Sequence, residues 1–300
     1  MMRPDDSSLS SGELLKVETI ATNLLHRSDA WGAVPLPLGD VLAAAKLKLA
    51  PYSVFDPRSI KAYIAVKGTQ VAKTIKSAIG KIFGILDASE EIIHIDDSLT
   101  PGKQLFLTLH ETGHFELPHQ RKLFRFFEDS EQELEPSIAD QFEREANNFA
   151  RFVMFNGDAF KQRAADMPLA FASIKKLQSQ FKTSMYASIR EYARTHHQVC
   201  FVAALEPTEV RSALGICAPV RRVEVSPSYE RMFGRPQTTL ITPGHALWPL
   251  IPLGGRRVTR PTTFILTDLN GDQHEFIGEA LDTTFNILLF ACPKKAFRTS

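Results

Sequence analysis

Apolar residues recur at intervals of three and four positions through much of the first two-thirds of the chain, which is the spacing of amphipathic helices. Pro35 and Pro37 end the first such segment. Thr100-Pro101 is typical of a helix start, with threonine as the N-cap and proline at the first helical position. The pattern predicts helices over 12–26, 38–49, 101–117 and 137–155, and two or three shorter helices within 157–197.

Strand patterns occupy two other regions. Residues 52–98 contain short β-branched runs, among them AYIAV at 62–66 and EIIHI at 91–95. After His197 strand-forming runs alternate with turns, and Asn270-Gly271 is typical of a hairpin. The runs of this last region cover 199–205, 220–225, 262–269 and 274–278. The sequence therefore predicts an α+β fold whose texture changes near residues 157 and 199.

The composition is that of a globular protein and narrows the range of functions. The formal net charge of +1 argues against a large nucleic-acid footprint. The three cysteines form no CxxC pair, which indicates a reducing compartment without a disulfide framework. The N-terminus is polar and acidic, unlike a signal peptide, and no run of about 18 apolar residues would span a membrane. We therefore expect a cytoplasmic protein, with a disordered tail at 1–11.

One motif carries chemistry, and it lies inside a predicted helix. The stretch His110-Glu111-Thr112-Gly113-His114 is HExxH. Residues four apart share one helix face at about 5–6 Å, so both imidazoles can bind one ion at about 2.0–2.1 Å each. Glu111 then lies beside the ion and can take a proton from a water bound there. The alternative is a pair of surface histidines, but the apolar turn at 106–109 favours burial, and buried histidines need partners.

The third ligand separates the classes of zinc protease. A metzincin would have glycine and histidine where this chain has Leu117 and Gln120, so that class is excluded. An acidic residue on a second helix remains, and the best candidate is Glu145, which precedes the small Ala146. From spacing alone Glu145 is either a metal ligand or a solvated helix residue like Glu143.

The chain resembles the ImmA/IrrE family of metallopeptidases. The resemblance lies in IIHIDDSLTPGKQLFLTLHETGH at 92–114 and EREANNFARFVM at 143–154, and extends weakly over about 12–200. It implies that His110, His114 and Glu145 hold a zinc ion, with Mn²⁺ as the alternative, and that Glu111 is the catalytic residue of a gluzincin-like enzyme. The loop FELPHQ after His114 is longer than the family's pattern.

The resemblance also implies how the chain is organised. It suggests a zincin-like metallopeptidase domain over 12–156 and a helical, helix-turn-helix-like subdomain over 157–198. The β-rich part at 199–300 takes the position of a sensor or regulatory domain in longer family members. Every candidate ligand lies before residue 157, so we expect no chemistry from the β-rich part.

The implied function is metal-dependent cleavage of a peptide bond in a helix-turn-helix transcriptional repressor, which would induce stress or mobile-element genes. The strand EIIHI could present its edge to an extended substrate. The alternative is a regulatory or interaction protein, antitoxin-like or DNA-binding, with a structural metal site. Glu111 argues against it, because a structural site has no use for that carboxylate.

Two further groups of residues lie in the helical segment. Its basic side chains could contact DNA, but such a charge cluster is usually a solvated face, and DNA binding is not expected. These are Lys175, Lys176, Lys182, Arg190 and Arg194. Tyr186, Arg190 or Tyr192 could stabilise the oxyanion of peptide hydrolysis, and the sequence does not choose among them.

Overall fold

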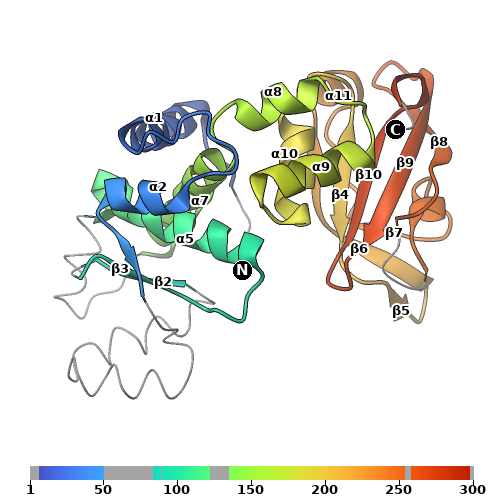
Figure 1. Cartoon of the computed structure of the whole chain (residues 1–300). Helices are drawn as coiled ribbons and strands as arrows, with labels where there is room; N and C mark the ends of the chain where they lie inside the picture. Colours follow the sequence, from blue (N-terminus) through green and yellow to red (C-terminus); the bar gives the residue numbers. More distant parts are fainter. Residues whose placement is uncertain (1–6, 51–83, 89, 122–134, 254–257, 298–300) are drawn as a thin grey trace. The chain divides into compact units, whose positions relative to one another are not determined.

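The computed structural model describes residues 7–50, 84–88, 90–121, 135–253 and 258–297. The chain divides into two compact units. Unit 1 comprises Met1–Ala159 with Phe181–Thr183, and unit 2 comprises Phe160–Gln180 with Ser184–Ser300. Each has its own helices, strands and buried core (Figure 1). The mixture of helix and sheet confirms the α+β class.

The described part of unit 1 combines helices with a small sheet of order β1-β3-β2. Its helices are α1 (Ser11–Arg27), α2 (Leu38–Ala45), α5 (Pro101–Glu116) and α7 (Pro136–Met154), and its strands are β1 (Lys48–Leu49), β2 (Gly84–Asp87) and β3 (Ile92–Ile95). β3 pairs in parallel with β1 and antiparallel with β2. The EIIHI strand is thus central, so the expectation that its edge receives substrate is wrong. The predicted run AYIAV lies outside the described residues.

The helices of unit 1 follow the sequence signals closely, with one exception. α5 begins after Thr100 with Pro101 at its first turn, as predicted. α2 ends at Ala45, short of the expected residue 49, because Lys46 adopts the left-handed conformation with φ of 60°. This residue turns the chain into β1.

The segment before α1 is tied to α7. Ser10 and Glu13 form a capping box at the start of α1, in which Ser10 N–H donates to Glu13 Oε2 at 2.8 Å. The Ser7 carbonyl accepts a hydrogen bond from Asn148 Nδ2 at 2.8 Å. Residues 7–10, part of the expected disordered tail, therefore have defined partners.

A glycine sets the distance between α5 and α7. A Cβ atom at Gly113 would lie 3.1 Å from Cδ1 and 3.2 Å from Cβ of Phe149 on α7. Such contacts are tighter than normal packing, so any larger residue at 113 would push the helices apart. Gly113 lies between the two histidines of the HExxH motif, and it therefore brings that motif close to α7.

Unit 2 is built on a curled seven-stranded sheet with path β5-β6-β4-β10-β9-β8, and β7 pairs with β6. Its strands are β4 (Phe201–Leu205), β5 (Glu209–Arg211), β6 (Gly215–Val225), β7 (Leu240–Ile241), β8 (Thr262–Thr267), β9 (Gln273–Asp282) and β10 (Ile287–Pro293). Its helices are α8 (Ala159–Ala165), α9 (Phe171–Phe181), α10 (Met185–Thr195), α11 (Pro227–Phe233) and the short 3₁₀ turns η1 (Trp248–Leu250) and η2 (Lys294–Ala296). Gly271, with φ of 91°, turns the chain between β8 and β9, which confirms the predicted hairpin.

Helices and strands of unit 2 share their buried contacts. The fully buried Tyr192 of α10 packs edge-on against Phe290 of β10, with ring centroids 5.7 Å apart. The other face of the sheet carries a second apolar cluster that includes Phe201, Tyr229 and Phe276. The two or three short helices expected within 157–197 are found as α8, α9 and α10, and α10 lies against the sheet (Figure 1).

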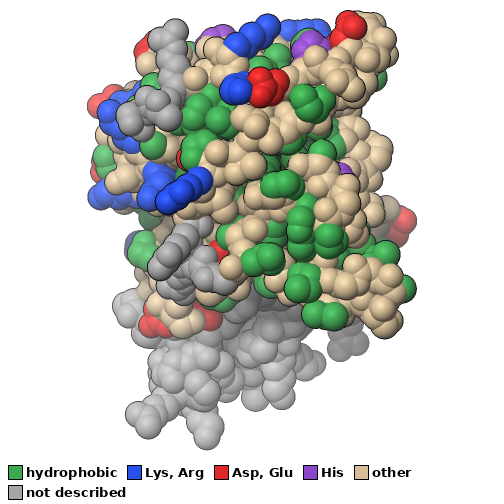
Figure 2. Space-filling view, turned by 90° about the vertical axis from the view of Figure 1, so that its right-hand side faces the viewer, with side chains coloured by type: hydrophobic (Ala, Val, Ile, Leu, Met, Phe, Trp, Pro, Cys, Tyr) green, Lys and Arg blue, Asp and Glu red, His purple; other side chains and the backbone are tan. Residues whose placement is uncertain are grey.

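The surface of unit 2 keeps some apolar side chains in solvent. Val210 on β5 and Phe285 before β10 are 79% and 77% exposed. Figure 2 shows hydrophobic side chains spread among polar atoms on the face that it presents. Within the described ranges, no helix is both long enough and apolar enough to cross a bilayer.

Candidate metal centre

The two histidines of HExxH meet inside unit 1. His110 and His114 lie one turn apart on α5, and they are only 8% and 5% exposed. Their Nε2 atoms are 3.1 Å apart. The helix therefore points two ring nitrogens at one buried spot.

α7 adds a carboxylate to the same spot. Glu143 Oε2 lies 3.3 Å from His110 Nε2, and Glu143 Oε1 lies 3.8 Å from His114 Nε2. Among the described residues, His110, His114 and Glu143 form a group whose ligand atoms all lie within 4.8 Å of one another. The Glu143 side chain is 26% exposed, so the group reaches solvent on its carboxylate side.

The outer nitrogen of each ring faces an amide oxygen. His110 Nδ1 donates to Asn147 Oδ1 at 3.1 Å, and His114 Nδ1 donates to Gln120 Oε1 at 2.6 Å. An amide oxygen only accepts hydrogen bonds, so each Nδ1 carries a hydrogen, and in the neutral ring each Nε2 then carries a lone pair. Partners of this kind are typical of metal-binding histidines, whose tautomer and ring orientation they fix.

The three candidate ligand atoms suit a divalent ion. Two Nε2 lone pairs and a carboxylate are all acceptors, and a cation between them stabilises their approach. Ligand atoms about 2.0–2.1 Å from one tetrahedral zinc ion lie roughly 3.3–3.4 Å from each other. The distances of 3.1, 3.3 and 3.8 Å bracket that value. Burial alone would lower the pKa of His110, but the Glu143 and Glu111 carboxylates raise it overall, so protons and metal ions compete for this spot.

Glu145, the residue expected as third ligand, is placed differently. Its Oε2 atom accepts hydrogen bonds of 2.6 Å from His119 Nε2 and from Gln120 Nε2, and its Oε1 accepts one of 3.3 Å from Gln141 Nε2. It is not a member of the group formed by Glu143 and the two histidines. Residues 143 and 145 lie about 200° apart around a helix, at roughly 100° per residue. Glu143 shares its face with Asn147, the partner of His110.

The electrostatics of Glu145 suit a carboxylate surrounded by donors. Burial raises the pKa of its carboxyl, but the hydrogen bonds from His119 and Gln120 outweigh burial and leave the pKa below its ordinary value. His119 is half exposed, whereas Gln120 is fully buried. Glu145 is therefore an ionised, buried carboxylate, and Gln120 lies between it and His114.

Glu111 is the half-buried neighbour of His110 on α5. Its charge is one cause of the raised pKa of His110. The sequence pattern treats Glu143 as a solvated residue, whereas the structure places its carboxylate beside His110 and His114. The available signal was the spacing Glu143–Asn147, which puts a carboxylate and an amide one turn apart on the face toward His110.

Two of the other candidates in the helical segment, Arg190 and Tyr192, are buried in unit 2. Arg190 and Arg194 both donate to Glu224 Oε1 on β6, which explains two of the five basic residues without DNA. The Tyr192 hydroxyl donates to the Pro168 carbonyl at 3.3 Å. Arg190 and Tyr192 therefore serve the packing of α10, and their environment does not favour a role as oxyanion donors.

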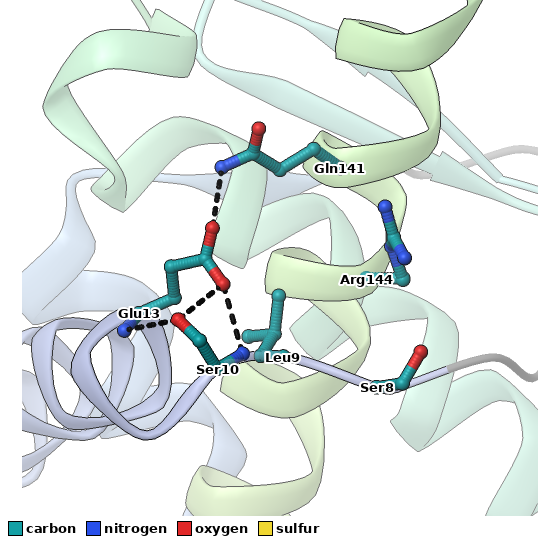
Figure 3. Close-up of a pocket in the computed structure, with 6 residues that line it drawn as sticks. All are labelled: Ser8, Leu9, Ser10, Glu13, Gln141 and Arg144. Atoms are coloured by element: carbon teal, nitrogen blue, oxygen red, sulfur yellow. Dashed lines mark hydrogen bonds between the residues drawn. The ribbon is translucent and has the colours of Figure 1, made fainter.

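A small polar pocket of about 320 Å³ opens beside α7. It is lined by Ser8, Leu9, Ser10, Glu13, Gln141 and Arg144 (Figure 3). Gln141 Nε2 donates to Glu13 Oε1 at 3.2 Å in this pocket and also to Glu145. Gln141 therefore connects the start of α1 with the surroundings of Glu145.

Comparisons with known proteins identify the region that holds these residues. Residues 70–187 match the family model described as peptidase M78, IrrE N-terminal-like domain. A solved structure titled "Mycobacterium tuberculosis transcriptional regulator" matches with a TM-score of 0.48 and 12% identity, covering 93% of this chain and 76% of that one. No curated protein sequence matches. The matched range takes in HExxH, Glu143 and Glu145.

Proposed function

Because residues 70–187 make this chain a member of the ImmA/IrrE family of metallopeptidases, we propose that it is a metal-dependent endopeptidase. The observation that carries the proposal is the buried convergence of His110 Nε2, His114 Nε2 and the Glu143 carboxylate. Family membership alone is consistent with an enzyme that has lost its site. The convergence of three acceptors supports a site that still binds a cation.

In this proposal His110, His114 and Glu143 hold the ion, and Glu143 replaces Glu145 of the sequence-based expectation. Two imidazole nitrogens and one carboxylate oxygen suit zinc, and Mn²⁺ is the alternative. Three protein ligands are the number that catalytic zinc sites use, which leaves room for water and substrate. When bound, such an ion supplies Lewis acidity toward the peptide carbonyl and the attacking water.

Glu111 acts as the general base. Its carboxylate lies beside His110 rather than among the three ligand side chains. It takes a proton from the attacking water and delivers it to the departing amine, so the scissile C–N bond breaks without releasing a charged amide. The half-buried position of Glu111 favours this role, because the carboxylate is shielded from bulk water and still open to a substrate.

We propose a helix-turn-helix transcriptional repressor as the substrate, with family membership as the support. We further assign regulation or recruitment to unit 2. The three ligand side chains all come from unit 1, and unit 2 exposes apolar side chains such as Val210 and Phe285 that a partner could cover.

The test compares wild type with Glu111→Gln in cells, where new protein N-termini are mapped by mass spectrometry. Glu111→Gln should keep zinc and the fold, because Glu111 is not a ligand, and should lower cleavage about 10²–10⁴-fold. We expect a set of new N-termini with wild type only, including one inside a DNA-binding repressor. Identical N-termini in both strains, with zinc bound in both proteins, would instead indicate a structural metal site.

A further inference from the structure

Glu145 is a buried carboxylate outside the ligand group, and it is held by three donors. His119, Gln120 and Gln141 all donate to it, at 2.6, 2.6 and 3.3 Å. Its side chain is only 7% exposed. Burying a carboxylate costs free energy, which these three donors offset, and the peptidase mechanism above gives Glu145 no role.

The direction of one hydrogen bond determines the next. An ionised carboxylate only accepts, so Glu145 fixes the Gln120 amide with its NH₂ group toward α7. The Oε1 atom of Gln120 must then face His114, and it accepts from Nδ1 at 2.6 Å. His114 consequently keeps its hydrogen on Nδ1 and its lone pair on Nε2, 3.1 Å from His110 Nε2.

The two histidines differ in how this partner is secured. Asn147 lies on α7, one turn after Glu143, and the rigid helix places it against His110. Gln120 lies in a helical segment that begins at Pro118, after the bend at Leu117 that ends α5. The terminal amide of Gln120 can rotate by 180° at little cost unless a neighbouring group can only accept hydrogen bonds. Two groups accept from Gln120 Nε2 and cannot donate to it: the Glu145 carboxylate at 2.6 Å and, at the longer distance of 3.4 Å, the Phe142 carbonyl.

We propose that Glu145 is a positioning residue, which acts through Gln120 to hold His114 in its metal-binding tautomer. The inference rests on the proposed metal centre. In Glu145→Gln the new amide can present its NH₂ group to Gln120. Gln120 then gives up its long hydrogen bond to the Phe142 carbonyl and turns its own NH₂ group toward His114. The hydrogen of His114 moves to Nε2, where it blocks the ion.

The test measures the zinc dissociation constant of the full-length chain by competition with a chromophoric chelator. Glu145→Gln should weaken binding about 10-fold or more, within the 10–100-fold range of losses at partners of metal-binding histidines. The exchanged pair Gln120→Glu with Glu145→Gln should restore wild-type affinity or exceed it, because a carboxylate then accepts from His114 and the amide at 145 donates to it. His119→Ala is the matched control, since it removes a donor to Glu145 without touching Gln120, and should stay within about threefold of wild type.

Each result has one meaning. Wild-type affinity in Glu145→Gln overturns the inference, and so does an exchanged pair that is as weak as the single variant, because the carboxylate then matters only for packing. Should Glu145→Gln fail to fold, Gln120→Leu replaces it, and a loss of less than threefold there overturns the inference as well. A wild-type protein that binds no zinc contradicts the proposed function, which is a different outcome from zinc binding that Glu145 does not affect.

Discussion

Each unit of the protein places a carboxylate among nitrogen atoms, but the two clusters are opposite in kind. In unit 2, Glu224 receives hydrogen bonds from Arg190 and Arg194, so donors face an acceptor. In unit 1, Glu143 faces the Nε2 atoms of His110 and His114, whose outer nitrogens carry the hydrogens. Three acceptors thus converge on one spot.

The difference shows which buried polar clusters indicate function. Burial and charge are common to both, and a shifted pKa is too, since the two arginines outweigh burial and lower the pKa of Glu224. The two clusters differ in whether hydrogen-bond donors face the carboxylate. The Glu224 cluster is complementary and stabilises the packing of α10 on β6, whereas the Glu143 cluster becomes complementary when a cation joins it.

The largest expected effect sharpens this contrast at the metal centre. Glu143→Ala should weaken zinc binding well beyond the roughly 100-fold limit for indirect partners, because it removes a ligand. Glu224→Ala, which removes the carboxylate of the other cluster, should leave zinc affinity unchanged. Competition titrations of both variants measure the contrast. Equal losses in the two variants would contradict it.

The second prediction concerns the free energy of unfolding, on which Glu224→Ala should have the larger effect. Glu224→Ala should lower the free energy of unfolding by about 2–3 kcal/mol, because it leaves two arginines of unit 2 without their carboxylate. The Arg194 side chain keeps 21% of its surface exposed, which holds the loss below that of a fully buried pair. In metal-free protein Glu143→Ala should cost less than Glu224→Ala, because the Glu143 side chain is 26% exposed, compared with 15% for Glu224. Urea unfolding with a chelator present gives both values.

A third effect concerns pH and lies in unit 2. His196 is buried and stacks on Tyr192, and burial lowers its pKa from 6.5 to about 4. Below pH 6.5 the unfolded chain therefore binds a proton at His196, whereas the folded chain leaves this ring neutral until about pH 4. The contribution of His196 to the free energy of unfolding is therefore complete above pH 6.5. It falls by about 2 kcal/mol as the pH drops toward 4.

Histidine NMR titration checks this directly. The ring of His196 should stay neutral until about pH 4, and His197→Gln, which changes the exposed neighbour, should leave that midpoint close to 4. A midpoint near 6.5 would show that the ring is solvated.

The smallest effect tests the helix contact that assembles the centre. Gly113→Ala should destabilise unit 1 by about 1 kcal/mol, because overpacking against Phe149 exceeds the roughly 1 kcal/mol that alanine gains in a helix. It should also weaken zinc binding a few-fold by moving α5 away from α7. Gly12→Ala in α1 meets nothing within 4 Å, and it should be neutral or stabilising. Thermal unfolding and zinc titration of the two variants provide the comparison.

Local signals in the sequence were sufficient for the helices that carry the centre. Thr100 and Pro101 mark the start of α5, the run at 137–155 is close to α7 at Pro136–Met154, and HExxH places both histidines on one face. These features depend on caps and periodicity, which act within a few residues. The end of α2 at Lys46 was missed, because a left-handed lysine has no sequence signature as strong as glycine has.

The third member of the cluster depends on how two helices cross, and spacing along one helix does not contain that information. The sequence favours Glu145 as the third ligand and treats Glu143 as a solvated helix residue. Only the contact of α5 and α7 at Gly113 shows that Glu143 and Asn147 face His110, while Glu145 meets Gln120 beyond the end of α5. The central position of β3 was missed for the same reason, since its partners come from distant parts of the chain.

The most direct test of the metal centre is an anomalous difference map, measured at the zinc absorption edge from crystals of the zinc-loaded protein. The account predicts one strong peak within about 2.0–2.2 Å of His110 Nε2, His114 Nε2 and a Glu143 carboxylate oxygen, with Glu145 still bonded to Gln120. A peak coordinated by Glu145 in place of Glu143 would contradict it.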